Sequence, residues 1–440
     1  MLRKKLDMFY KIPCLLTKLV FIRQRKWIFV NHNRLKFVTI QHRESEKTEM
    51  MEMEVWGLEW LKAFGTFWLQ PLLYYAFIFA LFIGWRRVQR ERRDFHTRVY
   101  RSSRELRALI RSRSWFAIIF SIVTVGAGIV LPNDTLVLWA MVTIICSFFM
   151  QLRLLSPAYI GSIVIFTVSF FAQMEWAKPF FDRFFPHMTE TNVTAVALLI
   201  GLLLFIEMWL VYREGAELSS PRLVTSKRGL TIGEQVVQRL WIVPLMIPVP
   251  GDGVQSFAAW WPIISGGDAY SFVLVPFLLG FSHRVQTNMP THMAKWIAKR
   301  IGWLATVVSL LAIASYWWEP LAIVVAVVAI LWREWIALSA KLYEQKRPPY
   351  FTKRANGLVI LGVLPDTPAH KMALSVGEVI VKVNGTPVVT EDEFYAALQQ
   401  NRAFCKLEVL NESGEVRFAQ TALFEGEHHE LGLLFVRDEG

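Results

Sequence analysis

Few residues in this 440-residue chain have the types and spacing that hydrolysis requires. A zinc protease needs the pattern His-Glu-x-x-His on one helix. The nearest match, His428-His-Glu430, has no second histidine at that spacing. A serine protease inside a membrane needs a serine among small residues, and the candidates are Gly161-Ser162 and Ser265-Gly-Gly267. Because such pairs are common where membrane helices pack closely, we expect no catalytic residues.

Two acidic residues fall within apolar stretches, and a charge inside lipid is a functional candidate by default. Glu207 lies six residues before Arg213, with which it can pair at the membrane interface. Asp252 lies in Pro250-Gly-Asp-Gly253, within an apolar segment over 240–282 that resembles the broken helices of transporters. A transporter and a regulated intramembrane protease therefore remain alternatives to a non-enzymatic role.

Composition divides the chain into a membrane part and a water-soluble part. A hydrophobic fraction of 54% and a mean hydropathy of +0.35 are too apolar for an ordinary soluble protein. All 18 tryptophans precede residue 336, whereas residues 354–440 hold 7 Lys and Arg against 13 Asp and Glu. We expect a multi-span membrane domain over 53–335, a linker over 336–353 and an acidic domain over 354–440. The three cysteines are far apart and predict neither disulfides nor a metal site, and we expect no cofactor.

Apolar segments predict six to nine membrane helices. They cover residues 67–85, 115–131, 135–150, 154–174, 193–212, 240–264, 269–282, 301–318 and 321–332. The segments 240–264 and 269–282 are expected to form a broken helical pair, because Pro244, Pro248 and Pro250 interrupt them. Several segments are shorter than the roughly 20 residues that span a bilayer, which leaves the number of spans open.

Basic residues orient these spans. Residues 86–114 hold 11 Arg against 3 acidic residues, and the loops 213–239 and 283–300 are also basic. Cytoplasmic loops of membrane proteins carry such an excess, so we expect these loops and the C-terminal domain in the cytoplasm. The basic loop 86–114 is expected to contact anionic lipid, and nucleic acid is not an expected partner.

The first 52 residues form a basic N-terminal arm that fits neither a membrane span nor a signal peptide. Residues 1–49 hold 12 Lys and Arg against 4 acidic residues, and these charges interrupt every apolar run. We interpret this arm either as a surface-bound basic segment or as the product of a wrongly assigned start codon. In the second case the true start is Met50, Met51 or Met53.

The C-terminal domain carries a strand, turn and helix pattern. A buried strand is expected over 358–364 and a second over 379–383, followed by the turn Asn384-Gly385. Thr390 and Glu393 have the spacing of a capping box, so a helix should begin there. Residues 406–410 and 415–423 flank a turn and predict a hairpin. With the runs 357–369 and 373–388, this pattern resembles the PDZ family, which binds peptides by adding a strand to a sheet edge.

The order of the motifs differs from that of most PDZ domains. Their carboxylate-binding loop precedes the first of these strands, yet here a similar run, Glu430-Leu-Gly-Leu-Leu-Phe-Val436, stands at the end. We interpret the domain as circularly permuted, with strand 431–436 lining the groove; the alternative is that 431–436 is only a closing edge strand. The resemblance then implies peptide-binding residues on this strand and on the helix after Thr390. They are Leu431, Gly432, Leu433, Leu434, Phe435, Glu391, Tyr395 and Leu398.

The layout from residue 53 to 440 resembles the MinJ-type cell-division topology determinants. A first span introduced by Trp56-Gly-Leu-Glu-Trp60, the arginine-rich segment 85–98 and a C-terminal PDZ domain carry the resemblance. It implies a polytopic α-helical membrane domain plus a small β-rich (α+β) domain, located in the cell membrane and enriched at septum and poles. It also implies a scaffold in division-site selection that bridges DivIVA-like and MinD-like proteins and contacts other divisome membrane proteins.

Overall fold

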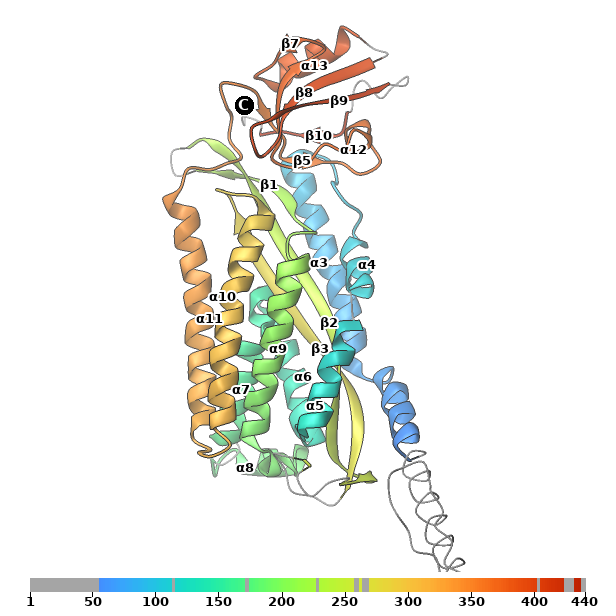
Figure 1. Cartoon of the computed structure of the whole chain (residues 1–440), viewed down its shortest axis with the longest axis vertical. Coiled ribbons are helices and arrows are strands. Elements are labelled where there is room, and N and C mark those ends of the chain that lie inside the picture. The colour runs from blue at the N-terminus through green and yellow to red at the C-terminus, as the bar shows by residue number, and fades with distance from the viewer. Residues whose placement is uncertain are drawn as a thin grey trace, which may run out of the picture. The chain divides into compact units, whose positions relative to one another are not determined.

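The computed structural model describes residues 55–112, 115–170, 174–226, 229–256, 261–262, 269–401, 404–422 and 431–436. The chain divides into two compact units, Met1–Leu61 and Lys62–Gly440. The described residues of the first unit, 55–61, are helical. Most of the predicted basic arm, residues 1–52, lies outside the described residues. The second unit holds a helical bundle, a three-stranded sheet and a small C-terminal domain (Figure 1).

Apolar helices build the bundle. Its elements are α3 (Pro71–Phe95), α4 (Arg104–Arg111), α5 (Trp115–Ala127), α6 (Asn133–Phe148), α7 (Pro157–Ser169), α8 (Lys178–Phe184), α9 (Val193–Glu214), α10 (Pro290–Ala314) and α11 (Leu321–Lys346), with the 3-10 turns Leu152–Leu155 and Met188–Glu190. Within the described part, the stretches long and apolar enough to cross a membrane are Val55–Phe95, Val193–Glu214, Pro290–Ala314 and Leu321–Lys346. Helices α6 and α7 are apolar but shorter.

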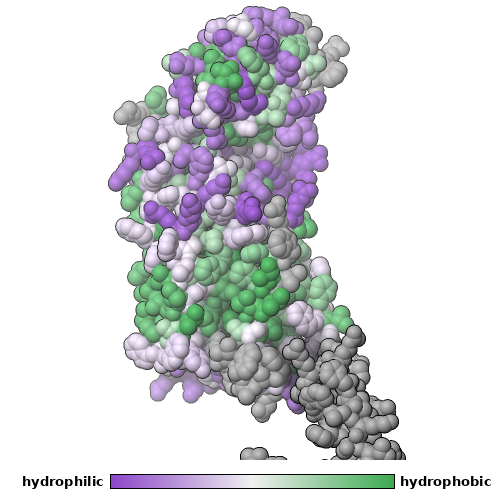
Figure 2. Space-filling model, viewed as in Figure 1, coloured by the Kyte–Doolittle hydropathy of each residue, from purple (hydrophilic) through white to green (hydrophobic). Residues whose placement is uncertain are grey.

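The outer surface of the bundle agrees with a membrane setting. Large apolar side chains such as Ile78, Leu331 and Trp335 are exposed there. Figure 2 shows a green band of hydrophobic residues on one face of the molecule, with hydrophilic residues between the band and the C-terminal domain. In water such a band would be unfavourable, whereas lipid tails cover it without cost. The expectation of a membrane domain is confirmed, while the number of spans remains a prediction.

The expected broken helical pair over 240–282 is wrong, because this segment forms a β-hairpin. Strand β2 (Thr231–Gln255) pairs antiparallel with β3 (Ala269–Val285), and β1 (Ser220–Thr225) pairs with the start of β2. Strand β2 runs beside α5 (Figure 1), and β3 packs against the 3-10 turn Leu152–Leu155. Strand β1 pairs with β2 only as far as Val236. Pro244 and Pro248 lie beyond that point, where β2 has a strand on one side only and a missing N–H is tolerated.

Helix α5 covers the other edge of β2. The Oγ of Ser121 accepts a hydrogen bond from the N–H of Met246 at 3.1 Å. The Oγ1 of Thr124 donates to the C=O of Met246 at 2.6 Å, and the N–H of Leu131 donates to the C=O of Pro248 at 3.1 Å. An uncovered strand edge has no water partners inside an apolar bundle, so these hydroxyl groups satisfy backbone groups that would otherwise destabilise the strand.

The C-terminal domain, called the tail domain below, covers 354–440 and is built from short strands. Its elements are β4 (Leu358–Val359), β5 (Gly362–Val363), α12 (Pro368–Lys371), β6 (Val379–Val383), β7 (Thr386–Pro387), α13 (Glu391–Gln399), β8 (Phe404–Leu410), β9 (Val416–Ala422) and β10 (Leu433–Leu434). Strands β4, β6, β8 and β9 form one sheet in that order, and β7 pairs with β6. Strands β10 and β5 form a separate pair.

Much of the predicted local structure of the tail domain is confirmed. The capping box is complete, since the Thr390 side chain accepts the Glu393 N–H and Glu393 accepts the Thr390 N–H. Asn384 and Gly385 have the positive φ angles of a tight turn, and β8 and β9 form the expected hairpin. The single strand expected over 358–364 divides instead, because β4 pairs with β6 while β5 pairs with β10.

Candidate functional site

Strand β10 and helix α13, which carry the predicted peptide-binding residues, lie side by side in the tail domain. The rings of Phe394 and Phe435 are in edge contact, with centroids 5.2 Å apart. Leu398 and Leu433 belong to the same apolar core as Phe435. The predicted residues Leu431 and Leu434 are buried, whereas Glu391 and Tyr395 on α13 are partly exposed. The two elements thus contact each other in the tail domain, and the groove between them and its binding role remain a prediction.

The hydrogen bonds of β10 define which of its edges faces away from β5. The N–H of Leu364 donates to the C=O of Gly432, and the N–H of Leu361 donates to the C=O of Leu434, each at 2.8 Å. Leu433 lies between these bonds, opposite Val363. In an antiparallel ladder the residue between two such bonds directs its own N–H and C=O to the opposite edge. The backbone of Leu433 therefore faces the edge at which an added strand would pair.

Gly432 is required by the fold of the tail domain itself. Its φ angle is +84°, a left-handed conformation that other residues rarely adopt. A Cβ atom at this position would lie 2.3 Å from the Oγ1 of Thr367, far inside van der Waals contact. The adjacent Leu431 C=O accepts the N–H of Ala369 at 3.0 Å. The close approach that this glycine permits is thus to Thr367 of the same domain.

The outer face of β10 is covered by the bundle. Leu434 and Val436 pack in an apolar cluster with Phe95 and Val99, which follow the apolar part of α3, and with Met289, which precedes α10. This docking cluster also contains Phe351, Val359, Leu361 and Val379. Burial of this many large apolar side chains holds the tail domain against the bundle. A partner strand could consequently reach β10 only at its edge.

Backbone hydrogen bonds strengthen this docking. The N–H of Gly233 in β2 donates to the C=O of Phe351 at 2.8 Å, and the Nε2 of Gln235 donates to the C=O of Leu361 at 2.6 Å. The linker residue Tyr350 donates its N–H to the C=O of Gln286 at 2.7 Å. Phe351 is fully buried. The linker that the sequence predicts over 336–353 is therefore the end of α11 followed by a short docked segment.

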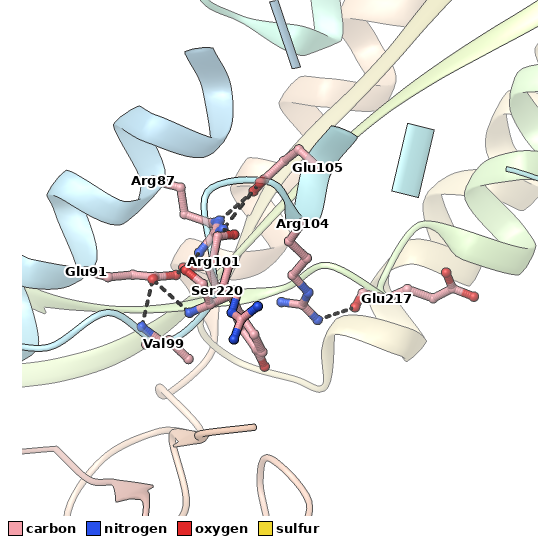
Figure 3. Close-up of polar contacts among 9 residues, drawn as sticks. Arg87, Glu91, Val99, Arg101, Arg104, Glu105, Glu217 and Ser220 are labelled. Carbon is pink, nitrogen blue, oxygen red and sulfur yellow. Dashed lines mark hydrogen bonds and ion pairs between the residues drawn. The ribbon is translucent and has the colours of Figure 1, made fainter. Parts of the chain in front are cut away.

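Part of the arginine-rich segment 86–114 is a buried ionic network (Figure 3). The Nη1 of Arg87 donates to Glu91 at 2.6 Å, and its Nε contacts Glu105 on α4. Glu91 also accepts the N–H of Val99 at 2.9 Å and the Oγ–H of Ser220 in β1 at 2.9 Å. These charges are buried and carry several hydrogen bonds each, which is the arrangement that makes a buried ion tolerable. The network fixes the chain between α3, α4 and β1.

The other arginines of this segment have a different environment. The guanidinium of Arg104 lies 3.3 Å from the centre of the Tyr100 ring and donates to the C=O of Glu217 at 3.1 Å. Among the described residues of the segment, seven arginines are exposed, namely Arg86, Arg92, Arg93, Arg98, Arg101, Arg107 and Arg111. Exposed arginines beside a membrane domain favour contact with anionic headgroups. The predicted lipid contact of segment 86–114 remains a prediction that these residues support.

The residues of the membrane domain that the sequence offers as catalytic or transport candidates take part in contacts between helices. The Ser162 hydroxyl donates to the C=O of Ala326 at 3.0 Å, and a Cβ at Gly161 would clash with Ile200 and Trp139. Both residues therefore serve close helix packing. Glu207 does not pair with Arg213 as expected; its Oε1 accepts from Arg333 at 2.8 Å on α11.

The remaining candidates contribute no assembled site in the described residues. Asp252 is exposed near the end of β2, where the pairing with β3 is irregular between Pro250 and Val254. Ser265 and His428-His-Glu430 lie outside the described residues. Within the part of the chain that the structure describes, no group of three His, Cys, Asp or Glu side chains has the arrangement of a metal site.

These features define a helical membrane protein with a docked, β-rich tail domain. No family model and no solved structure match the chain. The cell division topological determinant MinJ of Bacillus subtilis (strain 168) is 40% identical over 385 residues, which are 87% of this chain and 96% of that protein. A probable MinJ of Lacticaseibacillus paracasei is 28% identical over 265 residues, covering 57% of this chain and 68% of that protein. The chain therefore belongs to the MinJ family.

Proposed function

We propose that this protein is a membrane scaffold of division-site selection, a non-enzymatic role that bridges a polar DivIVA-like protein and a MinD-like inhibitor. The 40% identity to a cell division topological determinant over nearly its whole length carries this proposal. The structural partners of Ser162 and Glu207 also favour a scaffold over a protease or a transporter. The apolar spans would confine the scaffold to the membrane plane, with enrichment at septum and poles.

The tail domain is the part that we propose grips a partner, as a circularly permuted PDZ domain. Its strand pairing supports this view. If β9 takes the place of the first PDZ strand and β10 that of the second, then β10 should pair with the next strand and adjoin the second helix. The pairing of β10 with β5 and the contact between Phe435 and Phe394 meet both conditions. A peptide would then add to the β10 edge beside Glu391 and Tyr395.

Confinement to the membrane increases the effect of weak binding by the tail domain. Once several contacts join the same proteins, each further contact is effectively intramolecular, and its strength is set by local concentration. The tail domain is acidic, with 7 Lys and Arg against 13 Asp and Glu, so it would attract basic segments of its partners. We place the tail domain in the cytoplasm because the basic loops around it would follow the usual charge bias of membrane proteins.

Photocrosslinking in living cells tests the groove. A photoreactive phenylalanine analogue replaces Tyr395, which is partly exposed on α13, and the captured proteins are identified by mass spectrometry. The matched control places the same analogue at Phe418 of β9, which is 60% exposed. We expect DivIVA-like or MinD-like proteins to be captured from position 395 only. Equal capture from both positions would contradict use of the groove.

A charge reversal on α13 gives a second test. The change Glu391→Lys alters the proposed groove side, and Asp392→Lys makes the same change of charge one residue further on, at an exposed position. Both substitutions affect the first turn of the helix equally, so their common effect on helix stability cancels. Only Glu391→Lys should reduce partner capture and disturb septum placement. The same loss in both variants would point to overall charge instead.

A further inference from the structure

A large basic cavity lies between the bundle and the sheet. Its volume is about 700 Å³, which falls in the range of small-ligand sites. Side chains from α3, β1, β2, β3, α10 and α11 line it, together with residues between α6 and α7. Arg90, Arg222 and Arg284 in this lining come from the three basic stretches 86–114, 213–239 and 283–300. The cavity is distinct from the β10 edge of the tail domain.

Positive charge dominates the lining. The lining holds six cationic side chains, Arg90, Arg153, Arg222, Arg284, Arg333 and Lys341, against two carboxylates, Glu234 and Glu344. Three of the cations are in ion pairs, Arg153 with Glu334, Arg222 with Glu234 and Arg333 with Glu207. No ion pair to a described residue is found for Arg90, Arg284 or Lys341. Within the described residues the cavity thus holds three cationic side chains outside any ion pair, against one such carboxylate, Glu344.

Arg90 gives the clearest sign of a missing anion. Its Nε and Nη2 atoms are buried and have no hydrogen-bond partner among the described residues. A buried guanidinium nitrogen without an acceptor is costly, and an anion with several oxygens satisfies it best. Glu344 does not pair with Arg90: its Oε2 accepts the N–H groups of Gln286 and Thr287 at 2.8 Å, and its Oε1 has no hydrogen-bond partner among the described residues. The nearby imidazole of His283 is neutral, since burial lowers its pKa to about 4.

The position of the cavity indicates where the anion comes from. Helix α11 contributes Arg333, Ile336 and Lys341 to the lining, while Leu331 and Trp335 on the same helix are more than 60% exposed. An exposed tryptophan at the edge of an apolar band is typical of the membrane interface. The cavity therefore lies directly behind a lipid-facing helix, at the level where phospholipid headgroups are concentrated.

We propose that this cavity binds the phosphate-bearing headgroup of an anionic phospholipid, with Arg90, Arg284 and Lys341 as its contacts. The phosphate oxygens would accept hydrogen bonds from the unpaired nitrogens of Arg90. The acyl chains would leave along the exposed face of α11. Bound lipid would brace α3, the sheet and α11 against one another at the end that holds the tail domain.

Thermal denaturation of the purified full chain in detergent tests the site. The probes are short-chain phosphatidylglycerol, short-chain phosphatidylcholine and inorganic phosphate. We expect phosphatidylglycerol to raise the melting temperature most, in a saturable and salt-sensitive way. The variant Arg90→Gln/Arg284→Gln/Lys341→Gln should bind phosphatidylglycerol at least roughly tenfold more weakly. The control Arg213→Gln/Lys299→Gln/Lys346→Gln removes three exposed charges outside the lining and outside segment 86–114, and it should bind as the wild type does.

Other results of these measurements would contradict the proposed lipid site. A shift produced fully by inorganic phosphate would assign the cavity to a soluble phosphate and overturn the lipid source. Equal shifts with phosphatidylglycerol and phosphatidylcholine, or equal weakening in both triple variants, would overturn the site. If the first triple variant does not fold, the exposed Lys341→Gln change alone is compared with Lys346→Gln. Native mass spectrometry of the wild type then measures whether phosphatidylglycerol is retained over phosphatidylcholine, and equal retention would contradict the proposal.

Discussion

Arg333 on α11 donates a hydrogen bond of 2.8 Å to Glu207 on α9, across 126 positions of sequence. Both side chains are buried, with 3% and 0% exposure. Ser156 joins them, because its hydroxyl donates to the second oxygen of Glu207 and accepts from the Nε of Arg333. The negative charge of Glu207, which lies within an apolar stretch of the sequence, is therefore neutralised by Arg333 from another helix.

Removing one member of this pair should destabilise the membrane domain strongly. We expect Arg333→Met to cost about 3–5 kcal/mol, because it leaves the buried Glu207 carboxylate without its counterion. The double variant Glu207→Leu/Arg333→Met should recover most of that loss, since neither charge remains. Thermal denaturation of the detergent-solubilised variants measures the coupling. Additive losses in the double variant would show that the two residues act independently.

Leu433→Asp should unfold the tail domain rather than merely block the groove. Leu433 is 4% exposed and lies in the apolar core, so an aspartate there costs about 2 kcal/mol or more. The thiol of Cys405 reports the unfolding, because it is fully buried and burial raises its pKa to about 12. In a chain with Cys14→Ser and Cys146→Ser, alkylation should be fast for Leu433→Asp and slow for Val416→Asp, which changes an exposed residue. Slow alkylation in both would place Leu433 outside the core.

The edge of β2 gives a third prediction. Thr124→Val removes the hydroxyl that donates to the Met246 C=O and leaves that buried group without this partner. We expect a loss of about 1–3 kcal/mol in thermal stability. The control Thr306→Val removes an exposed hydroxyl that bonds only within its own helix, so its effect should stay within about 0.5 kcal/mol. Similar losses in the two variants would mean that α5 does not satisfy the strand edge.

The helix cap of α13 predicts a pH dependence. Backbone N–H groups of Val389 and Thr390 donate to Glu393 and hold its pKa below the ordinary value. A lowered folded-state pKa contributes stability above the unfolded value, and this contribution is lost as the pH falls through the lowered pKa. Hydrogen exchange of residues 390–399, compared at equal pH, should be slower in the wild type than in Glu393→Gln at neutral pH. The difference should begin to shrink below the ordinary glutamate pKa of about 4.3 and should be lost once the pH is below the lowered pKa. A difference that persists there would exclude the carboxylate as its cause.

The tail domain could be read from sequence because its signals are local. The capping box of Thr390 and Glu393, the Asn384-Gly385 turn and the β8–β9 hairpin each depend on residues a few positions apart. Adjacency of β10 and α13 followed from the family resemblance, since nothing in residues 431–436 alone specifies their neighbour. The docking of Leu434 and Val436 on the bundle had no sequence signal, because a run buried on both faces reads simply as apolar.

The β2–β3 hairpin was missed because length and hydropathy cannot separate a long buried strand from an apolar helix. The prolines in the segment did carry information. Pro244 pairs with Pro276 across the two strands, and neither residue suits a helix interior. The partner of Glu207 was missed for a different reason, since Arg333 lies in another helix and spacing along the chain does not reveal it. A search for opposite charges in separate apolar segments would have found the pair.

The length of β2 has a mechanical consequence. At about 3.3 Å per residue its 25 residues extend roughly 80 Å, more than the 40–45 Å thickness of a bilayer with its headgroups. Gly233 and Gln235 near its start hold the tail domain, and Pro248 near its end binds the segment after α5. One continuous strand therefore links the surface that holds the tail domain to the segment after α5. A pull on the tail domain would be carried along this strand to the Pro248 hydrogen bond without passing through a loop.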